Sequence, residues 1–165
     1  MLVGKTTLSM KELVGIFRGL GYFNIHTYIQ SGNVIFRSKT KCSNKTVAEI
    51  GSIIMENHGF EPKVLLLEAS ELETAQANNP FQVIEGKALH FYFLDSKPEN
   101  PDIQRLIKVK SVSEEFKLDG SVFYLHAPDG IGRSKLAAAV KQCLGVAVTA
   151  GNWNTVNKLI SMVEA

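Results

Sequence analysis

The order of helix and strand patterns along the 165-residue chain constrains its fold more than any single residue does. Residues 9–19 carry apolar side chains at helical spacing, and Ser9 with Glu12 forms a capping-box pattern at the start. Residues 24–30 and 34–36 predict a β-hairpin around Ser31-Gly32-Asn33. Three further elements complete this half: a helix capped by Ser43 or Asn44 and ended by Gly59, a short strand at 64–67, and a linking helix from Ser70 to about Ala77.

The second half of the chain repeats this order with one extra strand at its start. Its predicted elements are a strand at 89–94, a helix at about 102–109, a hairpin of 115–118 and 121–126 around Asp119-Gly120, a helix at about 134–144, a strand at 146–149 and a helix at 152–163. A shared order of elements in two halves indicates an approximate internal repeat.

The repeated order predicts an α+β protein of two ferredoxin-like βαββαβ halves with antiparallel sheets, followed by a C-terminal helix. The first half lacks its N-terminal strand, which would be central in such a sheet. We therefore expect an upstream segment or a partner chain to supply the missing strand, because its neighbours otherwise keep unpaired backbone groups. The break at Asn78-Asn79-Pro80 predicts a domain boundary, with the first domain at 1–78 and the second at 79–165.

Composition narrows the class of protein. The chain is 45% hydrophobic and 21% charged, which suits a globular core, and its net charge of +2 argues against a dedicated duplex-DNA binder. Cys42 and Cys143 lie far apart without metal-site spacing, which favours a reducing compartment. No apolar run approaches the length of a membrane span, so we expect a cytoplasmic protein with no membrane partner. The sequence predicts no cofactor and no metal.

The segment between the second hairpin and the next helix is the first candidate site. Gly130 and Gly132 allow close backbone approach, Arg133 and Lys135 add positive charge, and Ser134 precedes the helix N-terminus. Free N–H groups and the positive end of the helix dipole make such a segment a candidate binding site for a phosphate or carboxylate. The alternative is a tight connection in which Ser134 is an ordinary N-cap.

Two further polar segments are candidates for the same ligand. Asn152, Trp153, Asn154 and Thr155 open the terminal helix, although the asparagines can equally cap it and Trp153 can pack on the sheet. Gln30 and Asn33 lie at the first hairpin tip, where a turn also explains them. Together these segments predict an anion site at helix N-termini between the two halves.

The aromatic residues of the second half leave a second function open. Alternation along the strands places Tyr92 and Tyr124 opposite Phe91, Phe93 and Phe123, so an open sheet face could stack single-stranded RNA or DNA. A third possibility is a protein interaction module that takes a partner strand. The sequence has no catalytic constellation: no pair among its four histidines has metal-ligand spacing, and no serine sits in a nucleophile elbow.

Four ordered motifs resemble a known family. They are Tyr28–Phe36, Asn79-Pro80-Phe81, Asp129–Leu136 and Thr149–Leu159. In this order they resemble the bacterial family catalogued as domain of unknown function sixteen-ninety-seven. The resemblance implies two ferredoxin-like halves and no established activity. The family usually opens with a hydrophobic strand and an Arg-Gly-Ile-Asn segment, and it usually carries arginine where this chain has Gly151. The resemblance therefore implies weaker anion binding here if those arginines are ligands.

Overall fold

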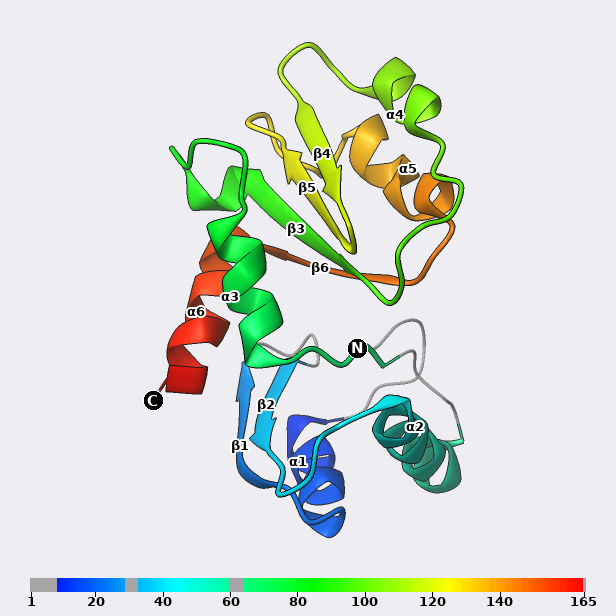
Figure 1. Cartoon of the computed structure of the whole chain (residues 1–165), viewed down its shortest axis with the longest axis vertical. Helices are drawn as coiled ribbons and strands as arrows, with labels where there is room; N and C mark the ends of the chain where they lie inside the picture. Colours follow the sequence, from blue (N-terminus) through cyan, green and yellow to red (C-terminus); the bar gives the residue numbers. More distant parts are fainter. Residues whose placement is uncertain (1–8, 29–32, 60–63, 165) are drawn as a thin grey trace. The chain divides into compact units, whose positions relative to one another are not determined.

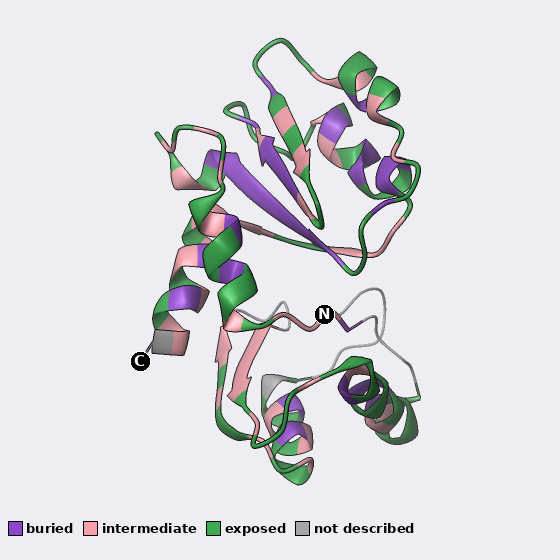
Figure 2. Cartoon of the chain, viewed as in Figure 1, coloured by how far each residue is buried: buried purple, intermediate pink, exposed green. Residues whose placement is uncertain are grey.

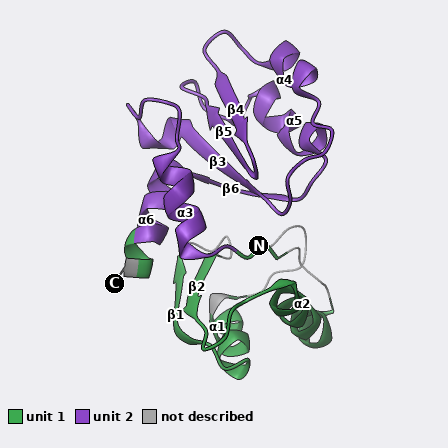
Figure 3. Ribbon diagram, in the orientation of Figure 1, with its two compact units in different colours: residues 1–66, 161–165 green, residues 67–160 purple. Residues whose placement is uncertain are grey.

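The computed structural model describes residues 9–28, 33–59 and 64–164 (Figure 1). These residues form an α+β protein with six α-helices and two antiparallel sheets. The chain divides into two compact units, the first made of residues 1–66 and 161–165 and the second of residues 67–160 (Figure 3). No described helix has the length and apolar character that crossing a membrane requires.

The first unit contains two helices and a hairpin: α1 (Met10–Gly19), β1 (Phe23–Tyr28), β2 (Asn33–Arg37) and α2 (Asn44–His58). The predicted capping box is confirmed, because the Glu12 amide donates to Ser9 Oγ at 3.1 Å. Gly59 ends α2 in the left-handed conformation, with φ of 77°. Leu13, Phe17, Ile50, Ile54 and Val64 form a small buried core, whereas no described residue of β1 or β2 is fully buried.

The short strand predicted at residues 64–67 is wrong. These residues form neither a strand nor a helix, although Val64 is buried in the core of the first unit. An apolar run becomes a strand only when a neighbour completes its backbone hydrogen bonds, and no strand among the described residues pairs with it. The sheet described in this unit is the β1–β2 hairpin alone.

The second unit follows the predicted order of elements. It contains α3 (Ala69–Ala77), a 3₁₀ turn (Gly86–Ala88), β3 (Leu89–Leu94), α4 (Ile103–Val109), β4 (Glu115–Asp119), β5 (Val122–His126), α5 (Lys135–Leu144), β6 (Val148–Asn152) and most of α6 (Trp153–Glu164). The strands lie in the order β4-β5-β3-β6, and all neighbours are antiparallel.

Both faces of this sheet are covered by helices of the same unit. Every residue of β3 is buried (Figure 2). On one face Tyr92 and Leu94 share a core with Leu136 and Val140 of α5. On the other face the ring centroid of Phe91 lies 6.0 Å from that of Trp153 at the start of α6.

The predicted open aromatic face is therefore wrong. Tyr92 is 8% exposed and Tyr124 is 1% exposed. The Tyr124 hydroxyl donates to the carbonyl oxygen of Ala75 in α3 at 2.7 Å, and burial raises its pKa to about 12. The strand register pairs Phe91 with Tyr124 and Tyr92 with Phe123, so the two tyrosines lie on opposite faces of the sheet and not on one shared face. A strand pattern of period two shows which residues share a face within one strand, but it shows neither the register between strands nor what covers a face. Neither tyrosine is available to stack a nucleic-acid base.

The division between the units lies before α3, whereas the sequence places the boundary after residue 78. Hydrogen bonds explain why α3 belongs to the second unit. Besides the bond from Tyr124 to Ala75, the Gln76 side-chain amide donates to Asn157 of α6. The linking helix is thus part of the layer that covers one face of the sheet.

Candidate functional site

The segment before α5 is folded around a buried carboxylate. Ser134 is the N-cap of α5: its Oγ accepts from the Ala137 amide at 3.0 Å and donates to Glu114. Glu114 is 4% exposed, and its other carboxylate oxygen accepts from the Ser111 amide at 2.8 Å. A carboxylate at this helix start supplies the negative charge that the dipole favours.

The other predicted residues of this segment are at the surface. Gly130, Gly132, Arg133 and Lys135 are exposed, and Gly130 has φ of +89°, which only glycine adopts without strain. The ordinary capping interpretation accounts for Ser134. Because the Glu114 carboxylate repels a phosphate or carboxylate ligand, this segment is a poorer anion site than its sequence indicates.

The residues that open α6 also have structural partners. Asn152 Oδ1 accepts from the Thr155 amide at 2.9 Å and caps the helix. The side chain of Asn154 lies against Gly86, where any Cβ would collide with it. A Cβ at Gly151 would lie 3.3 Å from Thr155 Cγ2, so a larger residue requires that side chain to shift.

The starts of α5 and α6 lie at one end of the sheet but on opposite faces. β5 and β6 both end beside the beginning of β3, where Leu89 pairs with His126 and His90 pairs with Asn152. However, α5 packs on the face of Tyr92, whereas Trp153 packs on that of Phe91. The structure therefore does not bring the two segments into one pocket. Gln30 lies outside the described residues, and Asn33 begins β2 opposite Tyr28 in the first unit.

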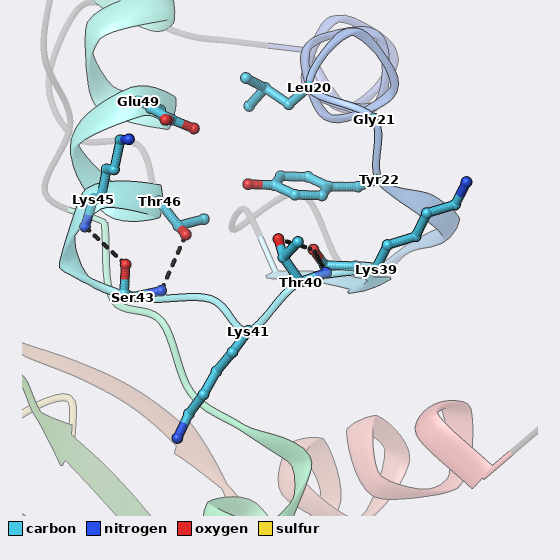
Figure 4. A pocket seen from close by; sticks show the side chains of 11 residues that line it. Leu20, Gly21, Tyr22, Lys39, Thr40, Lys41, Ser43, Lys45, Thr46 and Glu49 are labelled. Carbon is cyan, nitrogen blue, oxygen red and sulfur yellow. Dashed lines mark hydrogen bonds between the residues drawn. The ribbon is translucent and has the colours of Figure 1, made fainter.

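The first unit contains a cavity that our sequence analysis missed. Its volume is about 390 Å³ (Figure 4). Its lining comes from three places: the end of α1, the loop after β2, and the first turns of α2. The lining residues are Leu20, Gly21, Tyr22, Ser38, Lys39, Thr40, Lys41, Ser43, Lys45, Thr46 and Glu49.

Hydrogen bonds fix the backbone around this cavity. Ser43 is the N-cap of α2, and its Oγ accepts from the Lys45 amide at 3.3 Å. The Ser43 amide in turn donates to Thr46 Oγ1 at 3.0 Å, and the Thr40 amide donates to Ser38 Oγ at 3.3 Å. The polar wall is therefore held by its own local structure.

Tyr22 forms the opposite wall. Its ring centroid lies 4.6 Å from that of Phe36 and 5.8 Å from that of Phe17, so the ring is anchored on the core of the first unit. Burial raises the pKa of the Tyr22 phenol, Cys42 and Glu49 raise it further, and a hydrogen bond with Thr46 opposes them. The phenol is therefore neutral at physiological pH and offers a hydroxyl to the cavity.

The charge of the cavity is unbalanced. Three lysines and one glutamate line it. Within the described parts of the chain, no carboxylate lies within ion-pair distance of Lys39, Lys41 or Lys45. Lys39 and Lys41 point away from the Tyr22 ring, on the outer side of the loop (Figure 4). Like charges held close together repel, and flexible lysine stems let them separate.

This arrangement can bind an anion but supplies no evident catalytic pair. Its polar groups are ammonium groups, hydroxyls and one carboxylate, and no histidine or cysteine lines it. Over residues 9–28, 33–59 and 64–164, no group of three histidine, cysteine or acidic side chains is placed to hold a metal ion. The sequence signal that marks the site is three lysines within Ser38–Lys45, on both sides of the helix cap Ser43.

Comparison with known proteins identifies the family. The sequence pattern of the family described as protein of unknown function (DUF1697) matches residues 1–124. The chain belongs to this family, as its motifs indicate. The matched residues include the lysine-lined cavity, whereas the segments at 129–136 and 149–159 lie beyond them. No protein with a curated description matches the chain.

A solved structure with the same fold matches the chain. It is "the structure of conserved bacterial protein SP0830 from Streptococcus pneumoniae", which is 19% identical in sequence. The match covers 100% of this chain and 94% of that chain, with a TM-score of 0.66. At this identity the likeness shows a common fold and assigns no function.

Proposed function

We propose that this protein binds a small phosphate-bearing or carboxylate anion in the cavity at the start of α2. The observation that carries the proposal is the set of three lysines around one cavity, with no ion-pair partner among the described residues. An anion in the cavity would draw the flexible, outward-pointing Lys39 and Lys41 back toward it and so offset their mutual repulsion, and charge-assisted hydrogen bonds are stronger than neutral ones.

The distribution of charge between the units supports this location. Lysine and arginine clearly outnumber aspartate and glutamate in the first unit, whereas acids slightly outnumber bases in the second. An anion therefore meets a favourable field at the first unit. The Tyr22 hydroxyl and the hydroxyls of Thr40 and Ser43 are further donors around the cavity.

The proposal includes a finer description of the fold and of the compartment. The second unit has the element order βαββαβ and an antiparallel sheet in the order β4-β5-β3-β6, which supports a ferredoxin-like half. The first half of the chain would then be a less complete copy of the second half. Two free cysteines support a reducing compartment, and thus the cytoplasm.

Titration calorimetry with inorganic phosphate at low ionic strength tests the binding proposal. We expect Lys45→Ala and Lys41→Ala each to weaken phosphate binding about five- to tenfold, because each removes one charged hydrogen bond. The matched control is Lys11→Ala on α1, an exposed lysine that does not line the cavity. The proposal fails if wild-type protein gives no binding or if all three variants bind phosphate equally.

A further inference from the structure

The cavity has features that inorganic phosphate does not need. Its volume of about 390 Å³ lies within the range of about 300–1,000 Å³ that is typical of pockets for small organic ligands. A phosphate ion alone would leave most of this space to water. Leu20 and the ring of Tyr22 also give the cavity an apolar wall.

Glu49 is the second such feature. It is the one acidic residue among the lining side chains, and it lies one helical turn after Lys45 on α2. Among the described residues it forms no ion pair within 4.0 Å. A carboxylate at this place weakens the binding of a bare anion, but it accepts hydrogen bonds from hydroxyl or amino groups.

Glu49 and the loop after β2 lie on different sides of the cavity. In Figure 4 the Glu49 carboxylate lies beside Leu20 above the Tyr22 ring, whereas Thr40 and Lys41 lie below it. A ligand that spans the cavity would thus meet the hydroxyls of Thr40 and Ser43 at one end and the Glu49 carboxylate, with Lys45 beside it, at the other. Resting on the proposed function, we infer that the ligand is a sugar phosphate, either free or as part of a nucleotide.

The assignment of groups follows from this polarity. The phosphate lies at the loop of Thr40, Lys41 and Ser43, where the two hydroxyls donate to it. The ammonium group of Lys41 points outward in Figure 4, and its flexible stem lets it turn back to reach the phosphate. The sugar hydroxyls donate to Glu49, as ribose hydroxyls commonly do to acidic side chains. If the sugar carries a base, the base lies against the ring of Tyr22.

Competition of three compounds in titration calorimetry tests this inference on the full chain. The probes are inorganic phosphate, ribose 5-phosphate and adenosine monophosphate. We expect ribose 5-phosphate to bind about tenfold more tightly than inorganic phosphate, the effect of one or two charged hydrogen bonds. A further gain for adenosine monophosphate that is lost in Tyr22→Leu assigns the nucleotide, and equal affinity of the two assigns the free sugar phosphate.

The variant Glu49→Gln separates this inference from the proposed function. We expect it to reduce the preference for ribose 5-phosphate to less than threefold while inorganic phosphate binds as well or better. Glu56→Gln, an exposed residue on the same helix outside the cavity, should keep the full preference. Lysine-dependent binding with equal affinities for all three probes would overturn the sugar-phosphate inference alone. Absence of any binding would overturn the proposed function as well.

Discussion

The strands of the two units are buried to very different extents. All six residues of β3 in the second unit are buried between helical layers, whereas β1 and β2 of the first unit have no fully buried residue among those described. The second unit uses its polar groups for internal bonds, such as Ser134 to Glu114 and Tyr124 to Ala75. The first unit keeps three lysines around a cavity without a described ion-pair partner. The unit with the stronger fold signal in its sequence is therefore not the one with the better candidate site.

The sharpest test of this contrast compares one phenylalanine in each unit. Phe91→Ala removes a fully buried ring in β3 and should destabilise the protein by about 3–5 kcal/mol. Phe23→Ala removes a ring of β1 that is 42% exposed and should cost less than about 1.5 kcal/mol. Urea unfolding followed by circular dichroism measures both. Similar losses in the two variants would contradict the contrast.

Gly86 offers a test of the packing between the 3₁₀ turn and α6. A Cβ at this position collides with the end of the Asn154 side chain, which is exposed and can turn aside, so Gly86→Ala should destabilise the second unit by at most about 1 kcal/mol. Adding Asn154→Ala should recover most of that loss in a double-mutant cycle. Gly15→Ala in α1 is the control, because nothing lies within 4 Å and the helix should gain about 0.5–1 kcal/mol. Additive losses in the double mutant would show that the contact is absent.

Tyr124 tests how α3 is held to the sheet. Tyr124→Phe removes the hydroxyl and leaves the carbonyl of buried Ala75 without its partner, so we expect a loss of about 1–2 kcal/mol. The control is Tyr92→Phe in the same sheet, whose hydroxyl has no hydrogen bond with any described residue and which should change stability by less than about 0.5 kcal/mol. Thermal unfolding measures the stability of both variants. Equal losses in the two would contradict the claim that the Tyr124 hydroxyl holds α3 to the sheet.

His90 gives the smallest expected effect, through pH. It is buried in β3, its Nε2 atom has no hydrogen-bond partner among the described residues, and burial lowers the pKa of the imidazole below 6.5 against an opposing bond with the Lys87 backbone. The unfolded chain therefore takes up a proton that the folded chain resists. Stability is complete above pH 6.5 and falls as pH drops below it, by at most about 1.4 kcal/mol per pH unit.

Chemical denaturation between pH 7.5 and 5 measures that slope. His90→Leu should flatten it, whereas His26→Gln, an exposed histidine in β1, should leave it unchanged. A slope that survives His90→Leu would assign the proton uptake to another group.

Local patterns predicted the elements of this protein better than they predicted its surfaces. Ser9 with Glu12, Gly59 and the element order of the second half depend on neighbours in sequence, and they match the structure. The failed predictions depend on distant partners. Residues 64–67 lack a described neighbouring strand, and Tyr124 is covered by α3, which no pattern within β5 indicates.

The candidate site followed the same division. The sequence predicted Ser134 and Asn152 as possible helix caps. Their hydrogen bonds with Glu114 and Thr155 show that both side chains are occupied inside the fold. The lysines around the start of α2 escaped notice because the net charge of the whole chain is only +2, which hides the excess of positive charge in the first unit. Counting charge by unit, once the division was known, would have found them.

The most direct measurement of the central claim is an amide map of anion binding by nuclear magnetic resonance. The full chain is titrated with phosphate at low ionic strength, and amide shifts are followed in both units. We predict that shifts gather at residues 38–49 and at Tyr22, and that 130–135 and 152–155 stay unchanged. Shifts centred on 130–135 or 152–155, with residues 38–49 unaffected, would contradict the location of the site in the first unit.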